Sequence, residues 1–567
     1  MSAGIPMAGA IDWRRKINSE KLLKLLFLLA ALALMLIGLA LPLYTMLLKS
    51  LQNSRGEFIG LVNYQYYFST PALVNSIQNS FFIAFVTMLL VVSLAFLCAY
   101  GITRTCMPGK KLFRMLTLLP ILAPSLLPAI SLVYIFGTQG YLKTLLGDTS
   151  IYGPVGIVIG MCFWIFPHAL MILVTALSNS DARLYEAARA MKTSAFRTFM
   201  TVTLPGVRYG LMSCAFVVFT LAITDFGVPK VIGGQYSLLA TDIYKQVVGQ
   251  QNFQMGAVVS VILLLPALFT FIADRWVQRK QTAQLSSRAV PYQPEPSPMR
   301  DWLFAVLCYA VAAVILLIIG TAVYASLIHF WPYNLSFTLN HYRFEGLGGN
   351  GWESWFNSLK MAGGVALIGT LVIFTNAWLV EKSQEFPLLR QTVHLFAILP
   401  MAVPGMVLGL AYIFFFNHPN NPLNVLYGTL AILILNTLIH FYTVCHLTSM
   451  TALKQLDPEF ESVGASLKVP FWRTYTRVTL PVSLPAVLDI SVYLFVNAMT
   501  TVSAVVFLYG PDTRLASVSV LHLDEAGYFA SAAAMAVLIL LTSMGVKILH
   551  ALVTHLLLKK AQVWRQR

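Results

Sequence analysis

The side chains best placed to do chemistry in this sequence are polar groups that interrupt long apolar segments. Asp225 follows Thr224 at the end of one such segment, and Thr500 and Thr501 stand at the same place 276 residues later. A carboxylate in an apolar segment is costly to bury, which marks it as a candidate functional group. These four side chains could line a polar path where two parts of the chain meet. Alternatively, Asp225 caps a helix or pairs with a nearby cation.

The sequence offers no enzyme chemistry beside these groups. Its six cysteines form no CxxC pair, and no cluster of His, Asp and Tyr has the pattern of a metal site. The nearest approach to a phosphate-binding loop, residues 106–110, lacks the first glycine and the Ser or Thr that such a loop requires. We therefore expect no catalytic residue, no metal site and no cofactor bound by this chain.

Two polar loops carry apolar residues at helical spacing, i, i+3, i+4 and i+7. Each loop also carries an acidic side chain, Glu186 in the first and Glu461 in the second. A short amphipathic helix of this kind either docks against a partner protein or lies on a membrane surface, and the spacing alone leaves both open. The apolar faces are formed by Leu184, Ala187, Ala188 and Met191 in the first loop, and by Phe460, Val463, Gly464 and Leu467 in the second.

The two loops are copies of one another. Residues 181–205 align without a gap with residues 457–481, and both segments end in Val-Thr-Leu-Pro. Upstream, the pair Asn79-Ser80 reappears as Asn357-Ser358. Shared apolar composition does not place Asp, Lys, Arg and Leu-Pro in register, so the sequence indicates an internal duplication.

The elements that position these loops are long apolar runs. The chain is 58% hydrophobic and only 11% charged, which is typical of a polytopic membrane protein surrounded by lipids. The pattern predicts an all-α fold with twelve spans, at residues 25–48, 78–101, 114–137, 153–177, 209–228, 255–274, 302–327, 357–380, 392–416, 425–448, 484–508 and 530–552.

The duplication divides these spans equally. We expect a first domain at residues 1–277, a flexible, proline-rich linker at 278–301 and a second domain at 302–567. Six spans in each half give both halves the same orientation, so a pseudo-two-fold axis along the membrane normal should relate them.

The placement of basic residues predicts the orientation. With the N-terminus inside, cytoplasmic segments hold 30 Lys and Arg residues and outer segments hold 7. Both termini should therefore be cytoplasmic. The net charge of +16 reflects this bias, and we expect no nucleic-acid partner.

Prolines recur at matched places in the two halves. Pro120 and Pro124 lie in the third span, and Pro400 and Pro404 lie in the ninth. Because proline interrupts the helical hydrogen-bond ladder, these positions predict kinks. Such kinks suit helices that gate a path, and they suit packing equally well.

The first loop resembles the EAA loop of ABC importer permeases, the membrane subunits of binding-protein-dependent transport systems. Glu186-Ala187-Ala188 and the following Val202-x-Leu204-Pro205 have the spacing of that motif. The sequence departs from it at Lys192 and Lys468, where the family usually has glycine, and in the second loop, where Ser462 stands at the Glu position.

This resemblance implies partners. The loop of such a permease forms a coupling helix that docks on a cytoplasmic ATPase, so a fused chain would bind two copies of that subunit, which carry the ATP and Mg²⁺. The permease would lie in the inner membrane of a bacterium. It would receive its solute from a periplasmic binding protein.

The fused twelve-span layout resembles ferric-iron importer permeases. The segments Thr224–Pro229 (TDFGVP) and Leu239–Tyr244 (LATDIY) are similar to permeases for 2-aminoethylphosphonate, and on that likeness we favour a phosphonate over iron. A secondary transporter with duplicated halves is the alternative outside this class.

Overall fold

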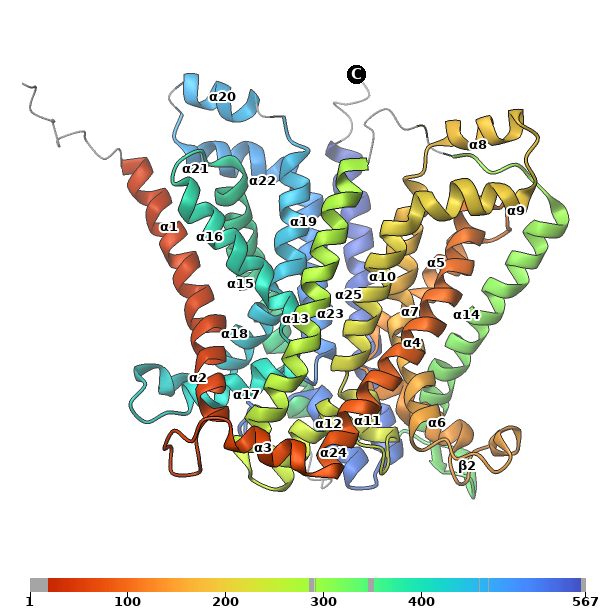
Figure 1. Ribbon diagram of the computed structural model, residues 1–567, viewed down its shortest axis with the longest axis vertical. Helices are drawn as coiled ribbons and strands as arrows, with labels where there is room; N and C mark the ends of the chain where they lie inside the picture. The colour runs from red at the N-terminus through yellow and green to blue at the C-terminus, as the bar shows by residue number, and fades with distance from the viewer. Residues whose placement is uncertain are drawn as a thin grey trace, which may run out of the picture.

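The computed structural model describes residues 19–284, 290, 292–344, 351–457, 459–467 and 469–561. Within them the chain is almost entirely helical, with one antiparallel two-stranded hairpin (Figure 1). The first half contains α1 Ser19–Met35, α2 Leu41–Ser50, α3 Val62–Ser69, α4 Pro71–Arg104, α5 Lys110–Thr117, α6 Leu126–Phe136, α7 Pro154–Ser178, α8 Ala182–Ala190, α9 Ala195–Thr198, α10 Leu204–Thr224, α11 Gly227–Ile232, α12 Leu239–Tyr244 and α13 Phe253–Gln284.

The second half follows a similar order, with the hairpin after its first helix and without counterparts of α3 and α11. It contains α14 Pro298–Leu327, β1 Ile328–Phe330, β2 Asn334–Phe337, α15 Gly351–Lys382, α16 Pro387–Ile398, α17 Gly405–Phe416, α18 Leu430–His440, α19 Tyr442–Lys454, α20 Glu459–Ser466, α21 Phe471–Thr474, α22 Leu480–Val482, α23 Leu484–Thr500, α24 Ala516–Glu525 and α25 Phe529–Ala561.

Long apolar helices dominate the fold. Among the described residues, eight helices are long and apolar enough to cross a bilayer, and four bent pairs of helices bring the number to as many as twelve. These twelve units overlap the twelve predicted spans one for one. Helices satisfy their own backbone hydrogen bonds, which is why a lipid-facing chain of this composition adopts them. The predicted all-α, polytopic fold class is confirmed.

The two sharpest bends lie at the matched prolines. Pro120 lies in a 3₁₀ turn, Leu119–Leu122, and Pro124 follows it, where the chain turns by 102°. Pro400 lies in the turn Leu399–Ala402 and precedes a turn of 113°. Pro404 caps the helix that follows. The predicted kinks are thus present in both halves, while movement about them stays a prediction.

The internal duplication is visible in side-chain contacts. Asn79 donates to the carbonyl of Ser237, and Asn357 donates to the carbonyl of Asp512. The hydroxyl of the serine that follows each Asn accepts a backbone N–H at 2.8 Å, from Leu239 in the first half and from Ala516 in the second. Each Asn-Ser pair therefore fixes the segment that precedes α12 or α24.

The halves exchange their first helices. α1 and α2 pack against α15, α16 and α17 of the second half, whereas α14 packs against α4, α5 and α6 of the first half (Figure 1). Gly38 makes the first exchange possible, since a Cβ there would lie 2.7 Å from the side chain of Ile439. The phenol of Tyr412 donates to the carbonyl of Gly38.

An ion pair fixes the start of this exchanged helix. Lys24 lies 3.0 Å from Glu385, in the turn between α15 and α16. Partial burial alone raises the pKa of Glu385, but hydrogen bonds from Lys24 and Ser383 outweigh it and hold the pKa below its ordinary value. The ion pair therefore joins the start of α1 to the second half.

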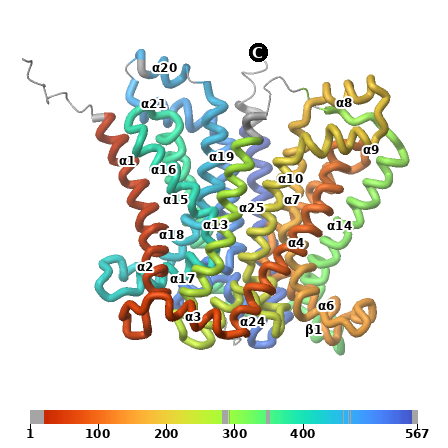
Figure 2. The backbone as a smooth tube through the Cα atoms, viewed as in Figure 1, coloured from red at the N-terminus to blue at the C-terminus, as the bar shows by residue number. Residues whose placement is uncertain are grey.

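Short elements gather at the two ends of the bundle. α8 and α20 stand at one end, where α1 begins and α25 ends, and α11, α12, α24 and the hairpin lie at the other (Figure 1 and Figure 2). We call these the loop-helix end and the hairpin end. The first and last described residues lie at the same end as the two loop helices.

Candidate functional site

The first loop helix, α8, presents apolar side chains that no other described residue of the chain covers. Asp181 caps its N-terminus by accepting the N–H of Arg183, and Ala182, Tyr185 and Ala188 are buried against the bundle. Leu184 and Met191 point away from the bundle, and the side chain of Met191 is 71% exposed. Glu186 and Ala187 are also exposed. The predicted face therefore divides, with Ala188 facing inward and the other three residues outward.

The second loop helix, α20, has the same arrangement. Phe460, Val463 and Leu467 are exposed, and the 71% exposed fraction of Leu467 equals that of Met191. Gly464 is half-buried, and a Cβ at this position would lie 2.9 Å from the hydroxyl oxygen of Thr474. Glu461 points toward the bundle, where its carboxylate lies 3.5 Å from the ammonium of Lys382. It is therefore an anchor of the helix and not part of its exposed face.

The two helices end in the same backbone turn. Thr193 donates its N–H to the carbonyl of Ala188, and Val469 donates its N–H to the carbonyl of Gly464. In the first loop this turn places Lys192 at φ 53°, in the left-handed region that favours glycine. Lys192, which replaces the glycine usual in the family motif, is thus held in a strained backbone conformation. Lys468 lies outside the described residues.

The predicted path residues stand where α10 and α23 stop. Asp225 and Thr501 have almost the same backbone angles, φ −68° and ψ 134° against φ −67° and ψ 136°. The buried carboxylate of Asp225 accepts the N–H of Val228, so it caps α11, as the alternative interpretation expects. Thr224 and Thr500 donate their hydroxyls to carbonyls one turn back in their own helices. Their role in a path stays a prediction.

A charged contact between the halves was missed by the sequence analysis. Lys230 on α11 lies 2.7 Å from Glu525 on α24, and the phenol of Tyr244 also reaches this carboxylate. The ring of Tyr244 contacts Phe226 on one side and Phe507 on the other. We call Lys230, Tyr244 and Glu525 the cross-half contact. The only signal in the sequence was that two of its members lie in or beside the segments TDFGVP and LATDIY.

A small cavity lies between the halves. Its volume is about 90 Å³, and it is lined by α10, α13 and Met401 of the second half. Thr220 and Thr270 share a hydrogen bond at its wall. Asp274, which also lines it, accepts hydrogen bonds from Ser213 and Gln278. Thr220, Thr270 and Asp274 line this cavity, whereas the predicted path residue Thr224, one turn further along α10, does not.

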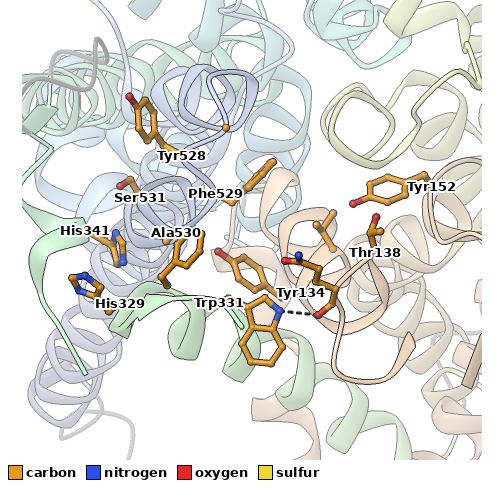
Figure 3. Close-up of a pocket in the computed structure, with 14 residues that line it drawn as sticks. Tyr134, Thr138, Tyr152, His329, Trp331, His341, Tyr528, Phe529, Ala530 and Ser531 are labelled. Atoms are coloured by element: carbon orange, nitrogen blue, oxygen red, sulfur yellow. Dashed lines mark hydrogen bonds between the residues drawn. The ribbon is translucent and has the colours of Figure 1, made fainter. Parts of the chain in front are cut away.

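A larger cavity of about 390 Å³ opens at the hairpin end, with walls from both halves (Figure 3). Tyr134, Tyr152, Trp331 and Phe529 make it largely aromatic. The indole of Trp331 donates to the carbonyl of Gln139 and so joins the hairpin to the segment after α6. Among the residues that the structure describes, no three His, Cys, Asp or Glu side chains gather as a metal site.

Comparison with known proteins identifies the architecture. Two stretches, residues 94–283 and 373–558, match the model of one family, the binding-protein-dependent transport system inner membrane component. The chain belongs to this family. Each match includes one loop helix and one of the bent proline spans, and together they cover more than half of the chain. α1 and α14, the exchanged first helices, lie outside the matched residues.

Several curated relatives are permeases of this family. The ferric transport system permease protein FbpB of Actinobacillus pleuropneumoniae is 28% identical over 492 residues, which cover 84% of this chain and 70% of the relative. A putative ferric transport system permease protein, FbpB 1, of Haemophilus influenzae is 29% identical over 460 residues, 78% of this chain and 71% of the relative.

A third relative matches only part of the chain. The probable sulfate transport system permease protein cysT of Nephroselmis olivacea is 26% identical over 250 residues, which cover 43% of this chain and 86% of the relative. The protein is therefore a multi-pass inner-membrane transport permease, in which two family domains follow one another in one chain.

Proposed function

We propose that this chain forms the complete membrane path of an ABC importer, with two copies of a cytoplasmic ATPase docked on α8 and α20. The observation that carries this proposal is the pair of exposed apolar faces at the same end of the bundle. An uncovered apolar surface on a loop helix favours a partner. A matched pair of such surfaces favours a partner present in two copies.

The loop-helix end would face the cytoplasm, together with both termini. The bias of Lys and Arg toward these segments supports that orientation. The ATPases would carry ATP and Mg²⁺, since this chain has no phosphate-binding loop of its own. The hairpin end would then face the periplasm and receive the solute-binding protein.

The cross-half contact closes the periplasmic end in this mechanism. ATP binding draws the two ATPases together, and α8 and α20 transmit that movement to the bent spans. Separation of Lys230 from Glu525, and of Tyr244 from Phe507, opens the space between the halves to the periplasm. After ATP hydrolysis the contact forms again and the solute leaves on the cytoplasmic side.

We propose ferric iron as the solute. The two relatives that cover most of this chain carry ferric transport names, and the match to the sulfate permease covers less than half of it. The initial preference for a phosphonate rests on two short segments, Thr224–Pro229 and Leu239–Tyr244, and receives no support from these relatives. The solute that the cognate binding protein retains decides between them: retention of Fe³⁺ supports the proposal, and retention of 2-aminoethylphosphonate would replace it.

The docking of the ATPase is tested by charging the exposed faces. Leu184→Asp with Met191→Asp on α8 should abolish co-purification of the ATPase at that site and reduce ATP-driven uptake at least tenfold, because two carboxylates replace the apolar contact. Phe337→Asp, at an exposed apolar residue of the hairpin end, is the matched control and should retain ATPase binding. Full ATPase binding by the α8 variant would contradict the proposal.

A further inference from the structure

Part of the segment between the halves lies against α8 instead of standing free. Val290 accepts the N–H of Ala182 at 2.9 Å and donates its own N–H to the carboxylate of Asp181. The described part of the segment expected to be a flexible linker thus contacts α8. We call residues 290 and 292–297 the strap.

The centre of the strap is a pair of tilted aromatic rings beside a buried cation. The ring of Tyr292 lies 4.6 Å from that of Tyr185 on α8. The guanidinium of Arg104, at the end of α4, lies 4.6 Å from the first ring and 5.1 Å from the second. Arg104 is only 3% exposed and also donates to the carbonyl of Leu177. Two aromatic faces and a carbonyl compensate a charge that is otherwise costly to bury.

The far end of the strap is fixed to the exchanged helix α14. Glu295 pairs with Arg189 on α8, and its carbonyl accepts from Arg300. The carboxylate of Asp301 accepts the N–H groups of both Ser297 and Cys106, each at 3.0 Å. Prolines at 294 and 296 restrict the backbone between these points, so little conformational entropy is lost when the strap docks. α8 is thereby joined through a stiff segment to α14.

We propose that the strap is a positioning device that holds α8 at a fixed angle and passes its movement to α14, with Tyr292 and Arg104 as its positioning residues. The inference rests on the proposed function, since it concerns how the movement of a docked ATPase is transmitted. Through the strap, a displacement of the first loop helix reaches both α4 of the first half and α14 of the second. The strap stays docked throughout the transport cycle.

The first test compares Tyr292→Ala with Tyr292→Phe in the complete transporter. Loss of the ring should lower solute uptake per ATP hydrolysed about fivefold, because α8 then moves without carrying α14 with it. Binding of the ATPase should be unchanged, since Leu184 and Met191 remain exposed. Tyr292→Phe retains the ring beside Tyr185 and Arg104 and should behave as the original chain. An unaltered ratio of uptake to hydrolysis in Tyr292→Ala, or loss of ATPase binding, would overturn the positioning role.

The second test does not depend on the ATPase. The sulfur of Cys106 lies 3.4 Å from the carbonyl oxygen of Pro294 in the strap, so Pro294→Cys should form a disulfide with this native thiol under mild oxidation. The same change combined with Cys106→Ser is the control and should form none. The oxidised chain should still transport, because the strap stays docked. Failure to cross-link, or transport that stops on oxidation and returns on reduction, would overturn the proposal. A chain that cross-links but binds no ATPase would contradict the proposed function alone.

Discussion

The two loop helices share a backbone and differ in the chemistry that holds them. At the end of α4, Arg104 meets the ring of Tyr185, whereas at the matched end of α15, Lys382 meets the carboxylate of Glu461. Both copies therefore have a cation at the end of the matched helix, but its partner is an aromatic ring in the first half and a carboxylate in the second. The cation of Arg104 is held by two aromatic rings and a carbonyl, whereas Lys382 and Glu461, which are 8% and 23% exposed, form a single ion pair at 3.5 Å. The difference indicates that α8 is held rigidly and α20 more loosely.

The largest effect should come from removing the cation of the first half. Arg104→Ala leaves Tyr185 and Tyr292 without their shared cation and leaves the carbonyl of Leu177 without a donor. We expect a loss of about 2–3 kcal/mol in the free energy of unfolding. Thermal unfolding of the purified chain in detergent measures it. Arg104→Lys should recover only part of the loss, and a variant as stable as the original chain would refute the difference between the two anchors.

A charge reversal should have a smaller effect in the second half. Lys382→Glu places two mostly buried carboxylates together at the base of α20 and should cost about 1–2 kcal/mol of stability, with little dependence on salt because the pair is screened weakly. The double variant Lys382→Glu with Glu461→Lys restores the pair and should recover most of the loss. Thermal unfolding at low and high salt measures both. No recovery in the double variant would show that the contact is not an ion pair.

Relief of strain in the first loop should stabilise the protein slightly. Lys192→Gly replaces a side chain at φ 53° with the residue that this conformation favours, so we expect a gain of about 1 kcal/mol. Lys192→Ala retains the strain and is the matched control. If both variants unfold at the same temperature, the turn at the end of α8 is not under strain.

The smallest effect should come from crowding in the second loop. Gly464→Ala adds the methyl group that Ala188 already has, but it brings that carbon to 2.9 Å from the hydroxyl oxygen of Thr474. We expect a loss of about 0.5–1 kcal/mol, recovered by adding Thr474→Ala. The unfolding temperatures of the single and double variants measure this loss and its recovery. A neutral Gly464→Ala would indicate that α20 shifts freely, which agrees with a looser anchor.

Local and repeated features of the molecule could be predicted from the sequence. Apolar runs predicted the spans, Pro120 and Pro400 predicted the matched bends, and the spacing of Leu184 to Met191 predicted a loop helix. These features depend on neighbours within a few turns or on a comparison of the chain with itself. The outward direction of Met191 does not follow from this periodicity, since Ala188 on the same predicted face is buried.

Contacts between distant residues could not be predicted in this way. Lys230 and Glu525 are nearly 300 residues apart and are not matched by the repeat, so no periodicity joins them. Tyr292 stands in a segment whose prolines and polar residues indicate a linker, and only the position of Arg104 shows what its ring contacts. Glu461 was expected to belong to the loop that couples to the ATPase, and spacing did not reveal that Lys382 approaches its carboxylate.

The exchange of first helices has a consequence for how the protein is made. α1 is synthesised first, yet the surfaces that it packs against, on α15, α16 and α17, leave the ribosome several hundred residues later. Until then the helix lies in the bilayer without these partners, whereas the surfaces of α4, α5 and α6 that α14 contacts are already made when α14 inserts. Folding of this chain therefore cannot be completed half by half, and a nascent chain that stops after its first domain leaves α1 without the helices that it packs against.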